Sequence, residues 1–430
     1  MQTYQREQES VKRKTTIPLN NVTTDDITVQ VVDGARLMEI AEEGLAAMFM
    51  EVGLEAMRQL FEQDVDTLVG PKGKHNEHRT ASRHGTESTK VALNGGKISV
   101  QKPRVRSDGH DVQLPCLPFF QSEDAMNRTM LTSLLCGVST RKFERIAAME
   151  GAEITGVSKS EVSRRFNVEL SKLMDEFFNR RLDKSYPSIM IDGMERGGMT
   201  IIVALGITSG GRKEILGLIE GGTENNIVVK QLFADLGERG LRMDEPRLFI
   251  LDGSKALAKA VRDTYGDMAL IQRCQIHKKR NVLAHLPESE QANIGLAISQ
   301  AYLEYDYEIA LDKLNGIASN LDHRYPDAAA SMREGLEETL TVHKLEVPGL
   351  LRKTLSNTNA MESANATAAS IVRRISKYQN GEMVLRHMAA GFIEAERGFR
   401  RVPGYKQIPS LINALYELTG VSEEQNGEVV

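Results

Sequence analysis

Two short apolar segments that each end in Asp-Gly constrain the fold of this chain more than any other feature. The first, Pro187–Gly193, reads PSIMIDG, and the second, Pro246–Gly253, reads PRLFILDG. An apolar run bounded by proline and glycine is typical of a buried central strand. An acid at the carboxyl end of such a strand lies at the rim of a sheet, where open α/β folds bind ligands. Asp192 and Asp252 are therefore candidate ligands of a divalent metal; the alternative is that each only caps a turn.

The segments around these two runs have the periodicity of strands alternating with helices. Three strands joined by glycine-rich turns predict an antiparallel meander, and two helix-strand pairs follow. The predicted strands are Ser188–Ile191, Met199–Ile207, Lys213–Ile219, Arg247–Leu251 and Met268–Ile271, and the helices are Asn226–Arg239 and Ser254–Tyr265. This is the element order of a ribonuclease H-like domain, an α/β fold in which the first and fourth strands are neighbours. We therefore expect Asp192 and Asp252 to lie side by side.

Charge is unevenly distributed along the chain. The 430 residues carry a net charge of −5, yet bases dominate residues 71–106 and 373–406. Acids concentrate in the predicted helices of residues 38–66 and 288–346. Such segregation fits a protein that holds a polyanion, such as double-stranded DNA, on one side.

Cysteine usage and hydropathy bear on the compartment. Three cysteines are too few for a disulfide framework, and no apolar run is long enough to cross a membrane. The N-terminus also lacks the apolar core of a signal peptide. The sequence therefore predicts a reduced, cytoplasmic protein with no membrane contact.

The first third of the chain predicts a tail, a helix and a basic hairpin. Residues 1–30 read as a flexible tail, and residues 31–70 read as a helical segment that stops at Gly70-Pro71. Residues 90–103, KVALNGGKISVQKP, have the alternation and Asn-Gly-Gly turn of a β-hairpin. Three bases at its end are candidate phosphate contacts, although a solvated charged loop is the alternative. These bases are Lys102, Arg104 and Arg106.

Residues 126–180 have helical periodicity and predict a helix-turn-helix. GVSTRKFERIAAMEG is its candidate first helix, and GVSKSEVSRRFNVELSKLMDEFF is the second. Ser158 and Glu161 have capping-box spacing at the start of the second helix. Outward residues near the start of a recognition helix contact bases and phosphates. Here they are Lys159, Ser160, Ser163 and Arg164, and an ordinary amphipathic helix is the alternative.

Beyond residue 276 only helical periodicity is found until the segment LSNTNAMESANATAASIVRRISKY. This segment predicts a helix that begins near Asn359, with Glu362 in its first turn. Asn365 and Arg373 share the face of Glu362 at offsets of three and eleven residues. An acid, an amide and an arginine on one face suit metal and phosphate. The alternative is that Asn359 and Glu362 form a capping box.

Together these residues resemble the bacterial Mutator-like transposases of the insertion-sequence 256 type, whose catalytic triad is Asp-Asp-Glu. Asp192, Asp252 and Glu362 stand at the triad positions, and the likeness covers roughly residues 75–400. It rests on YPSIMIDG, FILDGSKAL, QRCQIHKKRNVLAHLP and TNAMESAN, with GVSTRKFERI, VSKSEVSR and QKPRVRSDG upstream. Cys274 and His277 match the family's Cys-x-x-His motif, although Gln275 replaces the aromatic residue that many relatives have there.

The resemblance implies an enzyme that binds the ends of an insertion sequence, cleaves DNA strands and transfers them to a target. Asp192, Asp252 and Glu362 would hold two Mg²⁺ ions, or Mn²⁺ in their place, with Asp192 bridging both. The enzyme would act in the bacterial nucleoid as a homodimer or higher homo-oligomer on double-stranded DNA.

The resemblance also draws attention to the residues beside the Cys-x-x-His motif. Lys278, Lys279 and Arg280 are candidate phosphate contacts, as is Arg373. The roles of Cys274, His277 and Asn365 stay open, and a zinc site at the first two would need more ligands.

On this interpretation the chain has a DNA-binding region at residues 71–185 and a catalytic core at residues 186–275 and 348–415. An all-helical insertion at residues 276–347 divides the core, and residues 416–430 form a flexible tail. Two rival functions remain open. One is a non-catalytic DNA-binding regulator, and the other is a nuclease of the same fold that cuts without joining.

Overall fold

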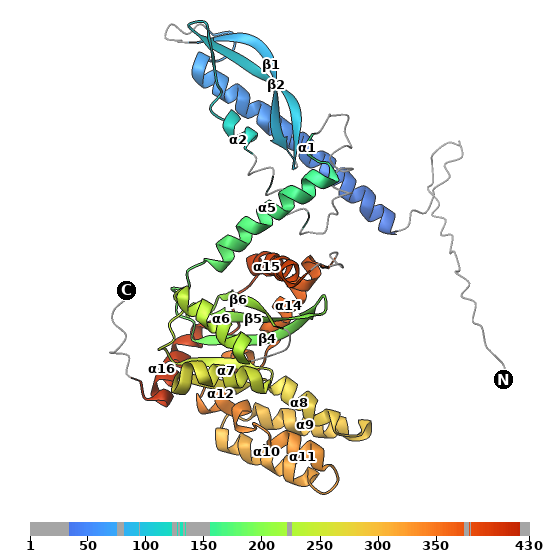
Figure 1. Cartoon of the computed structure of the whole chain (residues 1–430), viewed down its shortest axis with the longest axis vertical. Coiled ribbons are helices and arrows are strands. Elements are labelled where there is room, and N and C mark those ends of the chain that lie inside the picture. The colour runs from blue at the N-terminus through green and yellow to red at the C-terminus, as the bar shows by residue number, and fades with distance from the viewer. Residues whose placement is uncertain are drawn as a thin grey trace, which may run out of the picture. The chain divides into compact units, whose positions relative to one another are not determined.

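The computed structural model describes residues 34–74, 81–93, 95–122, 127, 130–131, 134, 155–221, 226–373, 378 and 380–421, with side chains from residue 51 onward. The chain forms two compact units (Figure 1). The first comprises residues 1–126 and 142–158, and the second comprises residues 127–141 and 159–430. Both helices and two β-sheets are present, so the chain is a mixed α/β protein.

The first unit is a long helix packed on a small antiparallel sheet. Its elements are α1 (Gly34–Val69), β1 (Ser82–Leu93), β2 (Gly96–Ser107), β3 (His110–Val112) and α2 (Leu117–Gln121). One face of α1 buries Met57, Phe61 and Val65 against strand residues that include Val91 and Ile98. The predicted helix and hairpin are confirmed, with Val91 opposite Ile98 in the register. The hairpin begins earlier than expected, at Ser82, and β3 was not predicted because it is only three residues long.

The second unit is built on a five-stranded sheet in the order β6-β5-β4-β7-β8. Its strands are β4 (Ser188–Arg196), β5 (Met199–Ile207), β6 (Lys213–Gly221), β7 (Arg247–Leu251) and β8 (Ala269–Arg273). The first three strands form the predicted antiparallel meander, and β4-β7 and β7-β8 are parallel pairs. The predicted neighbour relation of the first and fourth strands is therefore observed.

Helices cover both faces of this sheet because its central strands are apolar on both sides. On one face, Ile189, Ile191 and Phe249 pack against α6 (Asn226–Glu238) and α7 (Lys255–Tyr265). On the other, Met190 and Ile250 belong to a core that also holds residues of three C-terminal helices (Figure 1). These helices are α14 (Asn359–Ile371), α15 (Gly381–Arg397) and α16 (Ile408–Thr419). The result is a three-layer arrangement.

Residues 276–347 contain helices and no strand, as their periodicity predicts, and they have a core of their own. That core includes Val282, Ile298, Leu314 and Met332. The elements are α8 (Gln275–Ala284), α9 (Glu288–Leu303), α10 (Tyr307–Leu321), α11 (Pro326–Arg333), the 3₁₀ helix η2 (Glu337–Leu340) and α12 (Thr341–Lys344). The remaining short elements of the unit are η1 (Gly266–Met268), α13 (Gly349–Leu355) and η3 (Tyr405–Gln407).

Helix α5 (Lys159–Phe178) begins where the second helix of the helix-turn-helix was expected. Its predicted apolar face exists, but Leu170 on that face packs with Ala390 of α15, and the Phe166 ring stacks on His387 at 6.0 Å. The helix therefore belongs to the compact unit that contains the five-stranded sheet. All of the predicted first helix lies outside the described residues, so the helix-turn-helix stays a prediction.

Candidate active site

The parallel pairing of β4 and β7 brings Asp192 and Asp252 next to each other. The last paired residues are Ile191 and Leu251, and each acid is the residue that follows. The predicted end of the first strand was wrong in one respect, because β4 continues past Asp192 to Arg196 as the partner of β5. Asp192 therefore lies at the point where β4 loses its parallel neighbour β7 and continues only in the antiparallel part of the sheet, with β5 and β6.

Asp252 is half-buried and has a local structural role. Its Oδ1 accepts a hydrogen bond from the backbone N–H of Ser254 at 2.9 Å, which closes an Asx turn. Ser254 then caps α7, since its Oγ accepts from Leu257 N–H at 3.4 Å. Asp252 therefore does cap a turn, as the alternative interpretation predicted. The hydrogen bond to Ser254 holds one carboxylate oxygen at the start of α7.

Glu362 stands in the first turn of α14, the helix predicted to begin at Asn359. Small buried residues, Ala364 and Ala368, allow α14 to pack closely in the core that it shares with β4. The capping-box alternative does not describe Glu362. The Asn359 N–H donates to Asn357 Oδ1 at 3.0 Å, whereas Glu362 Oε1 accepts from the Thr358 hydroxyl at 3.4 Å.

Two side chains contact two of the three acids. Asn365 Nδ2 donates to Asp192 Oδ2 at 3.2 Å, which ties α14 to β4. His277 Nε2 lies 3.7 Å from Glu362 Oε1. The pKa of His277 is raised, chiefly by its hydrogen bond with Cys274 and further by the charges of Glu362 and Asp252. Asp192 and Asp252 therefore follow the last paired residues of adjacent strands, and α14 brings Glu362 near them, with Asn365 of that helix bonded to Asp192 and His277 beside Glu362.

Cys274 and His277 form a hydrogen-bonded group with Thr358 next to Glu362; Cys274 and Thr358 are buried and His277 is half-buried. Burial raises the pKa of the Cys274 thiol, but hydrogen bonds from His277 and Thr358 outweigh it and leave that pKa lowered. Thr358 Oγ1 is 3.5 Å from Cys274 Sγ and 3.3 Å from His277 Nδ1. Thr358 is fully buried and contacts all three side chains, and sequence reasoning missed it although it lies within the TNAMESAN motif.

The carboxylate and amide oxygens of this site are ligand types that suit a hard divalent cation. In this arrangement they are too far apart to coordinate one together. Among the described residues, no group of three or more His, Cys, Asp or Glu side chains is close enough to hold a metal ion. Carboxylates without a cation between them repel, which favours conformations that keep them apart. Asn365 Oδ1, buried beside Asp192, accepts no hydrogen bond within the described part of the chain. This oxygen and the three carboxylates are the ligand types that Mg²⁺ and Mn²⁺ prefer.

A second residue missed by sequence reasoning, Arg273, joins the Asp252 turn to the helical insertion. Its Nη1 donates to the Glu334 carbonyl at 2.8 Å. Gly253 and Gly335 both have positive φ angles, of 117° and 58°, and both backbones lie against this guanidinium. Two nearby residues add contacts, because Gln272 and Gln275 each donate a side-chain N–H to the Thr339 carbonyl at 2.8 Å.

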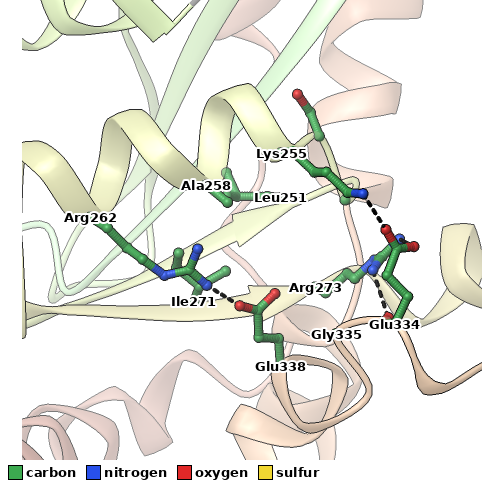
Figure 2. A pocket seen from close by; sticks show the side chains of 11 residues that line it. Leu251, Lys255, Ala258, Arg262, Ile271, Arg273, Glu334, Gly335 and Glu338 are labelled. Atoms are coloured by element: carbon green, nitrogen blue, oxygen red, sulfur yellow. Dashed lines mark hydrogen bonds and ion pairs between the residues drawn. The ribbon is translucent and has the colours of Figure 1, made fainter.

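A pocket of about 200 Å³ opens beside Arg273 (Figure 2). Its floor includes Leu251, Ala258 and Ile271, and its rim carries five charged side chains from α7, β8 and the insertion. The rim charges are paired across it: Lys255 with Glu334 at 2.9 Å, Arg273 with Glu334, and Arg262 with Glu338. These ion pairs hold the insertion against α7, both at its first residue, Lys255, and in its last turn, at Arg262.

A model of the family described as "Transposase, Mutator family" matches residues 26–401, which is most of the chain. The chain belongs to the Mutator family of transposases. The predicted resemblance is thereby confirmed, and the matched span contains both the three acids and the basic hairpin.

Individual members of this family are similar over most of their length. The transposase for insertion sequence element IS256 in transposon Tn4001 of Staphylococcus aureus is 29% identical over 321 residues, which are 71% of this chain and 79% of the relative. The transposase for insertion sequence element ISRM5 of Rhizobium meliloti is 27% identical over 372 residues, 84% of this chain and 91% of the relative. The transposase for element IS905 of Lactococcus lactis is 24% identical, with 86% and 95% covered.

In this Mutator-family chain, the predicted phosphate contacts beside the Cys-x-x-His motif differ in accessibility. Lys278 has an exposed fraction of 0%, and its ammonium donates to the carbonyls of Ser331 and Glu334 at the end of α11. This position does not fit the predicted contact with phosphate. Lys279 bonds the Ser299 hydroxyl at 3.0 Å, and Arg280 is exposed. The three consecutive bases therefore do not form one surface cluster: Lys278 is in the core and Arg280 is on the surface.

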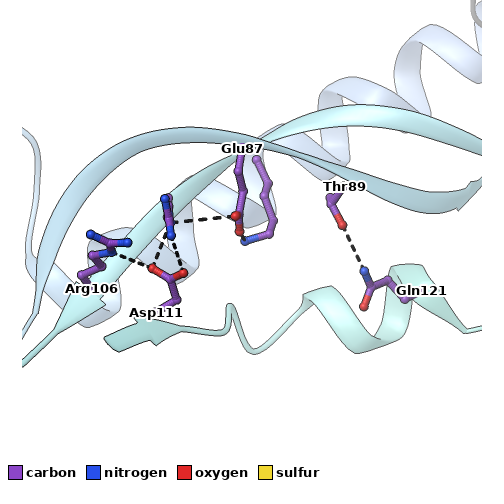
Figure 3. A network of polar contacts seen from close by, with 7 residues as sticks. Glu87, Thr89, Arg106, Asp111 and Gln121 are labelled. Atoms are coloured by element: carbon purple, nitrogen blue, oxygen red, sulfur yellow. Dashed lines mark hydrogen bonds and ion pairs between the residues drawn. The ribbon is translucent and has the colours of Figure 1, made fainter. Parts of the chain in front are cut away.

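The predicted contacts on the hairpin are engaged within the first unit. Lys102 is buried and pairs with Glu87. Arg104 binds both carboxylate oxygens of Asp111, at 2.9 and 2.6 Å, and Arg106 Nε donates to Asp111 Oδ1 at 2.8 Å (Figure 3). The Arg104 and Arg106 guanidinium groups hold the pKa of Asp111 well below its usual range. The three bases are thus partly neutralised by acids of the same sheet.

The remaining predicted contacts lie at the ends of two helices. All four candidates at the start of α5 are exposed, as expected: Lys159, Ser160, Ser163 and Arg164. The predicted position of Arg373 on the face of Glu362 was wrong, because α14 ends at Ile371 and Arg373 lies in the turn that follows. An offset of eleven residues therefore does not return it to the face of Glu362. Its neighbour Arg374 lies outside the described residues.

No helix in the described ranges combines the length and the apolar character needed to cross a membrane.

Proposed function

We propose that this chain is a transposase that binds the ends of an insertion sequence and catalyses metal-dependent cleavage and transfer of DNA strands. Membership of the Mutator family supports the activity, since its relatives carry the names of insertion-sequence transposases. The strand order supports the finer assignment of a ribonuclease H-like catalytic domain. The observation that carries the proposal is that Asp192 and Asp252 follow adjacent parallel strands while α14, which carries Glu362, is bonded to Asp192 through Asn365.

The three carboxylates take distinct roles in this proposal. Asp192 would be shared by two Mg²⁺ ions, and Asp252 and Glu362 would each hold one. When bound, such ions activate an attacking water or 3′-hydroxyl and stabilise the leaving oxygen of a phosphoryl transfer. The Asx turn of Asp252 and the Thr358 and His277 contacts of Glu362 keep these carboxylates at the rim.

The proposed partner is double-stranded DNA, both at the ends of the element and at the target. The exposed residues at the start of α5 and the bases of the hairpin remain the candidate contacts, with association into a homodimer or higher oligomer on the DNA. A polyanion bound in this way makes affinity fall steeply as salt rises.

The test is to compare the wild-type chain with the variants D192N, D252N and E362Q. Each variant removes one charge and leaves the side-chain shape nearly unchanged. We expect each to lose strand cleavage and joining in Mg²⁺ and to keep thermal stability and binding to element-end DNA. Gel shift and cleavage are measured on the same preparations, with D108N in the first unit as a control for charge removal elsewhere.

The outcomes also separate the rival functions. A wild-type chain that cleaves element ends but never joins them is a nuclease of this fold. A chain that binds ends and neither cleaves nor joins is a DNA-binding regulator. Near-wild-type cleavage by any one of the three variants would remove that acid from the proposed triad.

A further inference from the structure

Only one of the two polar atoms of the Asn365 side chain, the amide nitrogen, has a hydrogen-bond partner among the described residues. Its Nδ2 donates to Asp192 Oδ2 at 3.2 Å. Its Oδ1 is buried and has no hydrogen-bond partner within the described residues. A buried amide oxygen without a donor or a cation is unfavourable, so this atom marks a place where a ligand is expected.

The orientation of the amide follows from the charge of its neighbour. An ionised carboxylate only accepts hydrogen bonds, so the NH₂ group must face Asp192. Turning the amide around would place two acceptor oxygens together. Oδ1 is therefore directed away from Asp192 Oδ2 and remains available to an electropositive group.

The position of this oxygen distinguishes it from other unpartnered polar atoms. Buried atoms without a partner also occur elsewhere in the described chain, for example at Ser188, Tyr265 and Gln407. Among them, only Asn365 Oδ1 belongs to a side chain that bonds one of the three acids. Asn365 also follows Glu362 by three residues on α14, so the two side chains share a face of the helix.

We propose that Asn365 Oδ1 is a further oxygen ligand of the divalent cation that Asp192 holds. The inference rests on the proposed function and deepens it. An amide carbonyl is a hard, neutral ligand of the kind that Mg²⁺ and Mn²⁺ accept. It adds a donor to the site without adding repulsion among the three carboxylates. Asn365 then has two tasks: its NH₂ orients Asp192, and its oxygen completes the site.

The test measures Mn²⁺ binding by electron paramagnetic resonance on the full chain without DNA, so no catalytic activity is involved. Four variants are compared with wild type: N365A, N365D, D192N and N359A. Asn359 is exposed at the start of the same helix and serves as the matched control. Thermal unfolding without metal checks the fold of each variant.

We expect N365A to raise the Kd for Mn²⁺ about tenfold or more, the size seen when the supporting groups of a metal site are removed. N365D keeps an oxygen at the site and is expected to bind Mn²⁺ at least as tightly as wild type, although it loses the NH₂ donor. N359A is expected to match wild type. If N365A does not fold, N365D alone still carries the comparison.

Each contrary result has a distinct meaning. If D192N loses Mn²⁺ binding while N365A keeps it, Asn365 is not a ligand and the proposed function stands. If N365A and N365D both bind weakly, Asn365 acts only by orienting Asp192, which overturns ligation. If wild type and D192N have the same Mn²⁺ affinity, the proposed metal site itself fails.

Discussion

The guanidinium of Arg273 lies against the backbone of Gly253, so close that a Cβ added to Gly253 would be 2.6 Å from Arg273 Nε. Gly253 also has φ of 117°, a value that side chains disfavour. The residue before it is Asp252. Gly253 thus lets one arginine contact the turn of a proposed catalytic acid while its Nη1 binds the insertion through the Glu334 carbonyl.

Gly253→Ala is expected to lower the free energy of unfolding by about 1–3 kcal/mol, because it combines a disfavoured φ with a steric clash. We also expect the strand-cleavage rate to fall under conditions where the variant is still folded, because the clash moves the turn that carries Asp252. Gly198→Ala is the control: its φ is 78°, but nothing lies within 4 Å of the added Cβ. Chemical denaturation and cleavage are measured on both. Equal losses in the two variants would show that the Arg273 contact has no special role.

The burial of Lys278 is expected to make the free energy of unfolding depend on pH. Burial lowers its pKa to about 8, whereas an unfolded lysine keeps a pKa near 10.4. Between these values the unfolded chain binds more protons than the folded chain, so stability rises with pH. Lys278→Met removes this titration. We therefore expect the stability of wild type relative to K278M to increase from roughly pH 7 to pH 10.

The measurement is chemical denaturation of both proteins at the two pH values. Other groups titrate equally in the two and cancel in the difference. Lys279→Met controls for the loss of a neighbouring positive charge, since that ammonium bonds the Ser299 hydroxyl nearer the surface. A wild-type minus K278M difference that stays constant with pH would contradict the burial of a charged Lys278.

Local signals predicted much of the sheet and the position of its acids. The strand β7 matches its predicted bounds because its apolar run ends at Asp252-Gly253. The start of α14 matches because Asn359 is a polar residue of the kind that begins helices. The adjacency of Asp192 and Asp252 follows from strand order alone. The continuation of β4 past Asp192 could not be predicted, because GMERGG reads as a loop and becomes a strand only through pairing with β5.

Other errors arise where distant segments decide the outcome. The sequence after Ile371 contains no helix breaker, yet α14 ends there. Arg196 of β4 donates to the Val372 carbonyl at 3.0 Å and to the Tyr378 hydroxyl at 3.1 Å, so a strand residue caps this helix end. Lys278 is similar, because the carbonyls that receive its ammonium belong to the end of α11 and the residues after it. Periodicity does not report such long-range partners.

The packing of α5 on α15 gives a stability prediction. Leu170 is buried with Ala390, whereas Val168 on the same helix is 48% exposed. Leu170→Ala is expected to destabilise the second unit by about 2–5 kcal/mol through lost burial and a cavity. Val168→Ala is expected to change stability by less than about 0.5 kcal/mol. Denaturant unfolding of the full chain checks both.

This packing also bears on the predicted DNA-binding region of residues 71–185. A fragment that ends at residue 185 would lack α15 and expose the apolar face of α5. If L170A and V168A had equal effects, α5 would be free of α15 in solution, and that region could fold separately.

Asp111 links the hairpin network to the proposed DNA contact. Its carboxylate binds both Arg104 and Arg106, and these bonds keep it ionised. Asp111→Asn weakens its hold on the two guanidinium groups without removing any base. We therefore expect tighter binding of element-end DNA at low salt. The slope of log affinity against log salt should steepen by about one to two, as expected when one or two more phosphates are neutralised.

The matched control is Asp108→Asn in the turn between β2 and β3. It removes the same charge, but the Asp108 carboxylate accepts from the Ser107 hydroxyl at 3.4 Å. Affinities of both variants are measured over a range of salt concentrations, with thermal unfolding to confirm that the first unit stays folded. A larger change in D111N than in D108N assigns the effect to the two arginines. Equal changes would mean that net charge alone is responsible and that the hairpin arginines serve the sheet and do not contact DNA.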